Sequence, residues 1–176
     1  MAGLEAAVRS ATGWGGVAII AAYSFLIAIV LPLPSEVVLV PVYTETLSLG
    51  LPTGIELVLV MFASGLGKAA GSVIAFRIGH EAKRSGPVIR LLRRSRFDVV
   101  EWSERRTVAL AKRYGYVGMA GALCVPGFPD TISIYAFSVL EESYMKFAGA
   151  AYVGSVGRLA VTVTLVGVVG KGLGVL

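Results

Sequence analysis

The sequence Pro32-Leu33-Pro34-Ser35-Glu36 interrupts one apolar stretch, and Pro126-Gly127-Phe128-Pro129-Asp130 interrupts a second one in the same way. Proline removes a backbone donor, so both motifs predict helix breaks, at Pro32, Pro34, Pro126 and Pro129. Inside a membrane, broken backbone is tolerated only where it is buried in protein or lines a wet cavity. An ionisable residue is costly there and is a functional-site candidate by default, which selects Glu36 and Asp130.

The composition predicts an integral membrane protein. Of 176 residues, 56% are hydrophobic and only 15% are charged, which is more apolar than an ordinary soluble domain. The uncharged stretch from Gly13 to Leu31 would span roughly 28 Å as a helix, close to the ~30 Å hydrocarbon core of a bilayer. We therefore expect one all-α membrane domain over residues 1–176.

Several functional classes are disfavoured by the same sequence. The single cysteine, Cys124, excludes an internal disulfide and provides no metal cluster, so we expect no metal site and no cofactor. No second histidine or nucleophile motif supports hydrolysis, and we expect no enzyme activity. The basic residues do not indicate nucleic acid binding, because the rest of the chain belongs in lipid.

The chain divides into two halves that contain the same parts in the same order. Half 1 covers about 13–79 and half 2 about 114–170, and each holds a proline-broken segment with an acid, followed by a glycine-rich span. The two spans carry Ser64-Gly65-Leu66-Gly67-Lys68 and Gly154-Ser155-Val156-Gly157-Arg158. Internal repeats with broken helices are typical of secondary transporters. The expected fold has two related halves, each with a re-entrant segment and a transmembrane helix.

The basic residues predict the orientation. Residues 80–113 carry ten of the sixteen lysines and arginines against four acids, whereas the connector 44–53 carries none. The positive-inside rule places 80–113 in the cytoplasm of a multi-pass cell-membrane protein. Residues 114–140 could cross the membrane once or enter and return. A returning hairpin puts 141–146 inside and Lys171 outside, and a single crossing does the reverse.

Four charged side chains are the site candidates. A desolvated carboxylate favours its protonated form, so Glu36 and Asp130 could exchange protons or coordinate a cation, although each could also simply cap the following helix. Lys68 and Arg158 lie near the middle of apolar spans, where a cation costs roughly 2.5–3.5 kcal/mol and requires a partner. They are candidate counter-charges or ligands of a lipid phosphate, or a purely structural pairing, and the sequence does not reveal which acid each one meets.

The glycine-rich spans also predict close helix packing. Small residues let helix backbones approach each other in a membrane. The glycines concerned are Gly65, Gly67, Gly71, Gly149, Gly154 and Gly157.

Three stretches together resemble the DedA family of membrane proteins, also known by its VTT or SNARE-associated domain. They are Leu31 to Glu36, Gly65 to Gly79, and Tyr114-Gly115 leading to Val125-Pro126-Gly127, and the similarity covers roughly residues 13–170. The resemblance implies two re-entrant segments, and transport or scrambling of lipids, including polyprenyl-phosphate carriers, with proton or sodium coupling.

Position by position, the resemblance maps the family's membrane-embedded acid onto Glu36. The second family motif has arginines three residues before and three after its proline, but here Leu123 and Pro129 occupy those positions. Arg158 and Lys68 are then the remaining candidate phosphate ligands.

The first hypothesis is a DedA-like transporter or scramblase of lipids, coupled to protons through Glu36 and Asp130. Its expected partners are membrane lipids and protons or sodium ions, and it could form a homo-oligomer. The alternatives are a small exporter or exchanger of cations or cationic drugs, and a non-transporting assembly subunit.

Overall fold

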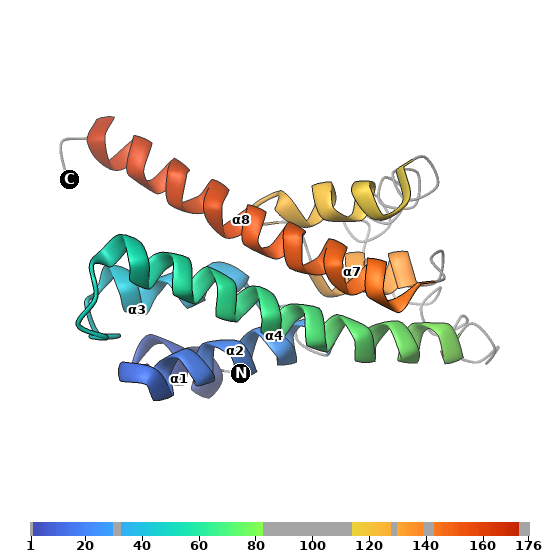
Figure 1. Cartoon of the computed structure of the whole chain (residues 1–176), viewed down its shortest axis with the longest axis horizontal. Coiled ribbons are helices and arrows are strands. Elements are labelled where there is room, and N and C mark those ends of the chain that lie inside the picture. Colours follow the sequence, from blue (N-terminus) through green and yellow to red (C-terminus); the bar gives the residue numbers. More distant parts are fainter. Residues whose placement is uncertain (1, 30–32, 83–113, 128–129, 139–142, 173–176) are drawn as a thin grey trace.

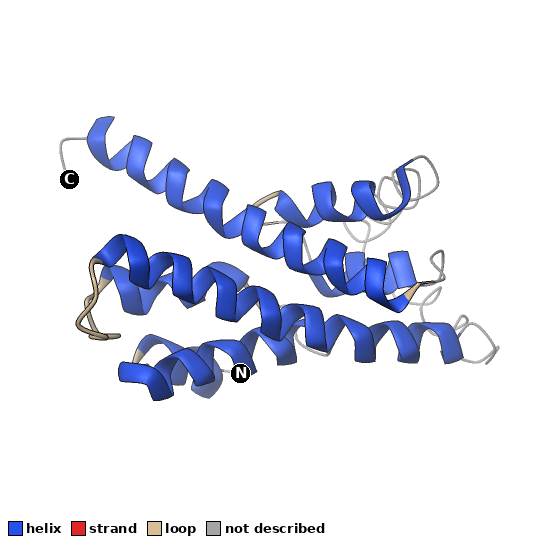
Figure 2. Ribbon diagram, in the orientation of Figure 1, coloured by secondary structure: helices blue, strands red, loops and turns tan. Residues whose placement is uncertain are grey.

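The computed structural model describes residues 2–29, 33–82, 114–127, 130–138 and 143–172. The helices, in chain order, are α1 (Ala2–Arg9), α2 (Gly13–Ile29), the 3-10 helix η1 (Ser35–Leu39), α3 (Val40–Tyr43), α4 (Thr53–Ala82), a helix over 114–124, α7 (Asp130–Ser138) and α8 (Tyr144–Gly172) (Figure 1). The described part of the chain contains helices and loops and no strand, which confirms the expected all-α class (Figure 2).

The two long helices α4 and α8 run in opposite directions through the molecule (Figure 1). Both are long and apolar enough to cross a bilayer, over Thr53–Ile78 and Tyr144–Val168. Their contact includes edge-to-face ring pairs, Phe62 with Tyr152 at 5.9 Å between centroids and Phe76 with Phe147 at 4.8 Å. The sequence predicts apolar spans over 57–79 and 147–170, and each helix extends a few residues beyond its span at both ends.

The first turn of α4 precedes the purely apolar stretch and is held by hydrogen bonds to the preceding loop. The carbonyl of Pro52 accepts hydrogen bonds from the N–H groups of Ile55 at 2.8 Å and Glu56 at 3.1 Å. The buried carboxylate of Glu56 accepts the N–H of Leu49 at 2.9 Å. An acidic side chain in the first turn is favoured by the helix dipole, so Glu56 both stabilises the first turn of α4 and holds the preceding loop.

The two ends of the first broken segment lie close together. This segment consists of α2, the break, η1 and α3, in that order. At the far end of this segment the carbonyl of Leu47 accepts the N–H of Gly13, the first residue of α2. The hydroxyl of Thr46 donates to the carbonyl of Arg9 at 3.5 Å. Residues 9–13 and 46–47 therefore lie side by side.

The two ends of the second broken segment also lie close together. It runs through the 114–124 helix, a turn and α7, and reaches α8 at Ser143 and Tyr144. The N–H of Ser143 donates to the hydroxyl of Tyr116 at 2.8 Å, and the Nζ of Lys146 lies 5.9 Å from the centre of the Tyr116 ring. The start of α8 thus lies beside the start of the 114–124 helix.

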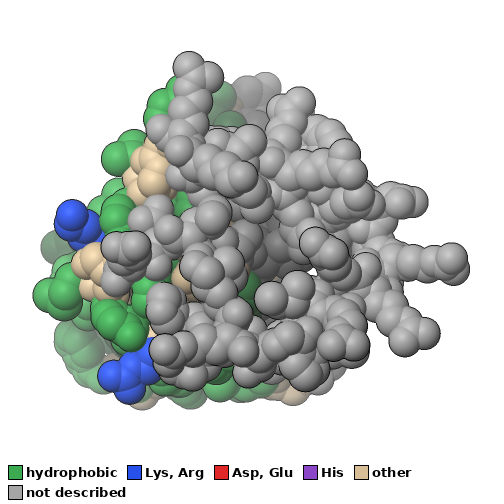
Figure 3. Space-filling model, turned by 90° about the vertical axis from the view of Figure 1, so that its right-hand side faces the viewer, with side chains coloured by type: hydrophobic (Ala, Val, Ile, Leu, Met, Phe, Trp, Pro, Cys, Tyr) green, Lys and Arg blue, Asp and Glu red, His purple; other side chains and the backbone are tan. Residues whose placement is uncertain are grey.

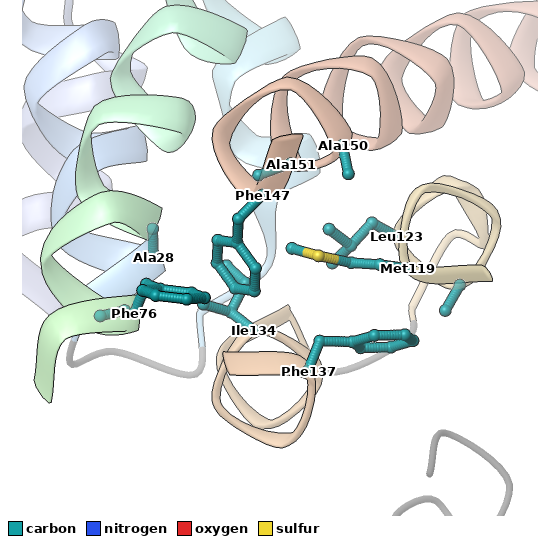
Figure 4. Packing of buried hydrophobic residues seen from close by; sticks show 11 residues of the cluster. Ala28, Phe76, Met119, Leu123, Ile134, Phe137, Phe147, Ala150 and Ala151 are labelled. Carbon is teal, nitrogen blue, oxygen red and sulfur yellow. The ribbon is translucent and has the colours of Figure 1, made fainter. Parts of the chain in front are cut away.

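Two clusters of buried hydrophobic residues hold the helices together. The first cluster joins the end of α2, the end of α4, the 114–124 helix, α7 and the start of α8 (Figure 4): Ala28, Ala75, Phe76, Met119, Ala122, Leu123, Ile134, Phe137, Phe147, Ala150 and Ala151. The second cluster joins α1, α2, η1, α3, the start of α4 and the later part of α8: Val8, Ile20, Tyr23, Ile27, Val37, Val38, Leu39, Val42, Leu47, Val60 and Leu159. Each cluster therefore contains residues from both long helices.

Five of the six glycines that were predicted to pack closely lie where helices touch. A Cβ at Gly67 would clash with the carbonyl of Ala21, and one at Gly71 would clash with the carbonyl of Phe25, so α4 presses directly on the backbone of α2. Close contacts are also found at Gly65, Gly154 and Gly157. Gly149 is the exception, because nothing lies within 4 Å of its Cβ position and no close helix contact requires a glycine there.

Candidate functional site

Glu36 and Arg158 meet inside the molecule. Glu36 lies in the first turn of η1, which begins immediately after Pro34, and its side chain is 24% exposed. Arg158 lies near the middle of α8 and is 2% exposed. Its Nη1 atom is 4.0 Å from Oε1 of Glu36. The first acid therefore pairs with the cation of the other half of the sequence.

The guanidinium of Arg158 also reaches the second break. Its Nε donates to the carbonyl of Leu123 at 2.8 Å, in the last turn of the 114–124 helix. Its Nη1 donates to Oγ of Ser35 at 3.4 Å, next to Glu36. Carbonyls in the last turn of a helix have no partner within that helix. Arg158 thus provides a donor for the carbonyl of Leu123, which the second break leaves without a helical partner. The same side chain also pairs with Glu36 at the first break.

The backbone of the second break contacts the same carboxylate. The N–H of Gly127 donates to Oε1 of Glu36 at 3.3 Å. Gly127 has φ +75°, in the left-handed region that glycine adopts without strain, and it follows Pro126 in the turn after the 114–124 helix. One carboxylate oxygen therefore faces a guanidinium and a backbone donor, and the two breaks meet at Glu36.

Two tyrosines flank the first break. The hydroxyl of Tyr23, on α2, donates to the carbonyl of Pro34 at 3.0 Å. The hydroxyl of Tyr135, on α7, donates to the carbonyl of Ile29 at 2.8 Å, at the end of α2. One of these carbonyls lies before the first break and the other lies after it. Tyr135 comes from the second broken segment, so this bond also links the two halves of the sequence.

The other two candidate charges are described less completely. Lys68 is fully buried in the middle of α4, as its position in the apolar span predicts. Asp130 is the first residue of α7, at the beginning of a helix, but its side chain lies outside the described residues. Pro32, Pro129 and residues 83–113 also lie outside them. The pairing of Lys68 with an acid stays a prediction.

Sequence reasoning found the charged residues of this site but missed the groups that hold them. Ser35 is a buried hydroxyl next to the acid, and its position directly inside a proline break was an available signal. Tyr23 and Tyr135 carry hydroxyls within apolar helices, where such a group usually finds a partner. The N–H of Gly127 and the carbonyl of Leu123 carry no signal in the sequence, because every residue has such groups.

Together these features are typical of a helical membrane protein. The described residues form helices and loops without strands, two helices have the length and composition of membrane spans, and an ion pair joins α8 to the first broken segment. The sequence profile of the VTT domain matches residues 13–168. The chain belongs to this family, the DedA family, whose members are membrane proteins. No curated protein and no solved structure matches the chain.

Proposed function

We propose that this protein is a DedA-type lipid transporter or scramblase, with Glu36 as the residue that couples lipid movement to protons. The observation that carries this proposal is the placement of Glu36, whose Oε1 faces both Arg158 and the N–H of Gly127. Protonation of this carboxylate would remove its charge and weaken its attraction to Arg158. The contact between the two breaks would then depend on the protonation state of Glu36.

We further propose that the molecule consists of two related halves with re-entrant segments that enter from opposite ends. The bonds from Gly13 to Leu47 and from Ser143 to Tyr116 support a return of each segment to its own starting end. Phe62 and Tyr152 support the relation between the halves. They lie six residues before Lys68 and Arg158, at matching positions of the repeat, and their rings contact each other. Such a contact between matching residues is expected on a two-fold axis.

The same arrangement predicts where Lys68 finds its partner. Arg158 of the second half meets the acid of the first half. A two-fold relation would bring Lys68 of the first half to the acid of the second half, Asp130. Helix α4, which carries Lys68, packs against α7, which begins at Asp130. We therefore assign Asp130 and Lys68 to a second, equivalent coupling pair.

The orientation follows from the end of the molecule that joins the basic segment 80–113. Helix α4 ends there and the 114–124 helix begins there (Figure 1). From this end, the described side chains that are visible are mainly hydrophobic, with lysine or arginine at the rim (Figure 3). Arg77 lies 5.9 Å from the centre of the Tyr144 ring at the same end. Cations beside aromatic rings are typical of the membrane interface. Because the basic segment 80–113 joins this end, the positive-inside rule places it in the cytoplasm, and we place Lys171 on the opposite side.

The environment of Arg158 supports a lipid with a phosphate group. The family pattern expects an arginine at position 123, which holds Leu123 here. The guanidinium of Arg158 binds the backbone carbonyl of this same residue, so an arginine is present at this place from another helix. The planar guanidinium matches phosphate geometry. Large hydrophobic side chains exposed along α4 and α8, such as Phe62, Leu66 and Leu165, offer contacts for lipid chains.

The test is lipid translocation in proteoliposomes of the purified protein, with and without an imposed pH gradient. We expect Glu36→Gln to lower gradient-dependent flux by at least ten-fold while the protein still folds. Glu45→Gln is the matched control, because Glu45 is an exposed acid in the connecting loop and should have no effect.

Three other results would each contradict the proposal. Absence of lipid flux in the wild type would reject it directly. Flux that follows a cation gradient and ignores lipid identity would favour a cation exporter or exchanger. If Glu36→Gln abolished folding or partner binding instead of flux, the protein would act as an assembly subunit. The proposed activity moves its substrate without chemical change, so the protein would not be an enzyme.

A further inference from the structure

Helix α8 carries two hydroxyl residues on the same face as Arg158. Ser155 precedes Arg158 by three residues and Thr162 follows it by four, and residues at these spacings are neighbours on the surface of a helix. Ser155 is 1% exposed, and the Oγ1 atom of Thr162 is buried although the residue is half-buried. Two buried hydroxyls thus flank the ion pair of Arg158 and Glu36, one turn before it and one turn after it.

Neither hydroxyl has a hydrogen-bond partner among the described residues. Two other hydroxyls in the long helices bond to a carbonyl of their own helix. The hydroxyl of Thr164 donates to the carbonyl of Ala160 at 2.8 Å, and that of Ser72 donates to the carbonyl of Ala69 at 2.7 Å. Ser155 and Thr162 do not make this bond. A buried hydroxyl without a partner is unfavourable, so a group from outside the chain is expected beside each of them.

The space beside Ser155 favours a very small partner. A Cβ at Gly154 would lie 2.6 Å from the Cβ of Leu123 and 2.9 Å from the carbonyl oxygen of Ala120, so α8 and the 114–124 helix are in close contact there. A Cβ at Gly157 would meet the Sγ of Cys124. A lipid headgroup does not fit between surfaces packed so closely. A single water molecule is the smallest group that could satisfy such a hydroxyl, and buried water usually satisfies polar groups of this kind.

We propose that Ser155 and Thr162 bind water molecules that form a hydrated track along α8 past the pair of Arg158 and Glu36. The track would provide the route by which water and the coupling proton reach Glu36 from the end of α8 that lies beyond Thr162. This role in coupling rests on the proposed function, but the presence of water at the two hydroxyls does not.

Cysteine labelling tests the hydration directly. Thr162→Cys and Ser155→Cys would be made in a Cys124→Ala background, since Cys124 is the only native cysteine. The reagent is methyl methanethiosulfonate, which reacts with the thiolate, and a thiolate forms only where water is present. The controls are Leu159→Cys, which is fully buried in the second core cluster, and Val161→Cys, on the exposed apolar surface.

We expect positions 155 and 162 to react at least ten-fold faster than positions 159 and 161, as followed by mass spectrometry of the protein in lipid vesicles. Rates at 155 and 162 equal to those at 159 would overturn the proposal, because the face would then be dry. If Cys124→Ala fails to fold, the same variants are made with Cys124 present and the wild-type rate is subtracted.

Removal of the hydroxyls provides a second measurement. Thr162→Val keeps the shape of the side chain, and Thr164→Val, two residues further along the same helix, is its control. For a hydrated face we expect Thr162→Val to slow gradient-dependent flux several-fold without raising the melting temperature. A raised melting temperature with unchanged flux would indicate a dry, unsatisfied hydroxyl and would contradict the proposal.

The labelling result and the Glu36→Gln result separate the two proposals. Fast labelling at 162 with full flux in Glu36→Gln would reject the coupling role of Glu36 and retain the hydrated track. Slow labelling with loss of flux in Glu36→Gln would reject the track and retain the function.

Discussion

Arg158 and Glu36 form an ion pair between α8 and the first broken segment, with Nη1 4.0 Å from Oε1. The same guanidinium binds the carbonyl of Leu123, and the same carboxylate accepts the N–H of Gly127. Both members of the pair thus have a second contact in the turn that contains Pro126. Any movement that separates α8 from either break must disrupt at least one of these contacts, so the pair links the two broken segments mechanically.

This arrangement predicts unequal effects for the two members of the pair. Arg158→Met should cost about 3 kcal/mol or more of stability, because it removes a buried cation together with three of its contacts. Glu36→Gln should cost less, since the amide oxygen can still accept the N–H of Gly127. Melting temperatures in detergent would measure both. The double variant should lose less than the sum of the two single effects, and strictly additive losses would show that the two side chains do not interact.

The glycines of α4 give a prediction with an internal control. Gly67→Ala and Gly71→Ala place a methyl group against the backbone carbonyls of Ala21 and Phe25, which cannot move without shifting α2. Each should destabilise the protein by roughly 1–3 kcal/mol, the usual cost of overpacking. Gly149→Ala meets no neighbour within 4 Å and should stabilise α8 by about 0.5–1 kcal/mol through helix propensity. The melting temperatures of the three variants in detergent would test this prediction. Equal changes at all three positions would refute the packing described for α4 and α2.

The hydroxyl of Tyr135 should stabilise the end of α2. Tyr135→Phe leaves the ring in place and deprives the carbonyl of Ile29 of its donor, which we expect to cost about 0.5–1.5 kcal/mol. Tyr152→Phe is the control, since the described structure shows a ring contact with Phe62 and no hydrogen bond of the Tyr152 hydroxyl. A melting temperature lowered by Tyr135→Phe and not by Tyr152→Phe supports the bond. An equal change in both would mean that the Tyr135 bond contributes nothing specific.

Much of this protein could be predicted from local features of its sequence. The long apolar runs around Lys68 and Arg158 predict helices α4 and α8 because apolar stretches of this length have few alternatives in lipid. The prolines at 34 and 126 predict breaks because they cannot donate a helical hydrogen bond. The rarity of charge inside such segments singled out Glu36 and Arg158. Each of these arguments depends only on residues close together in the chain.

The tertiary structure alone decided which of these parts meet. A charge pattern along one chain does not reveal that Arg158 pairs with Glu36, because the pair depends on the antiparallel course of α4 and α8 and on the packing that brings both breaks to α8. The partners that complete the site, the N–H of Gly127 and the carbonyl of Leu123, belong to the backbone and are identical in every residue. The sequence therefore determined the helices, the breaks and the charges. Their assembly into one site depends on long-range packing, which no local pattern encodes.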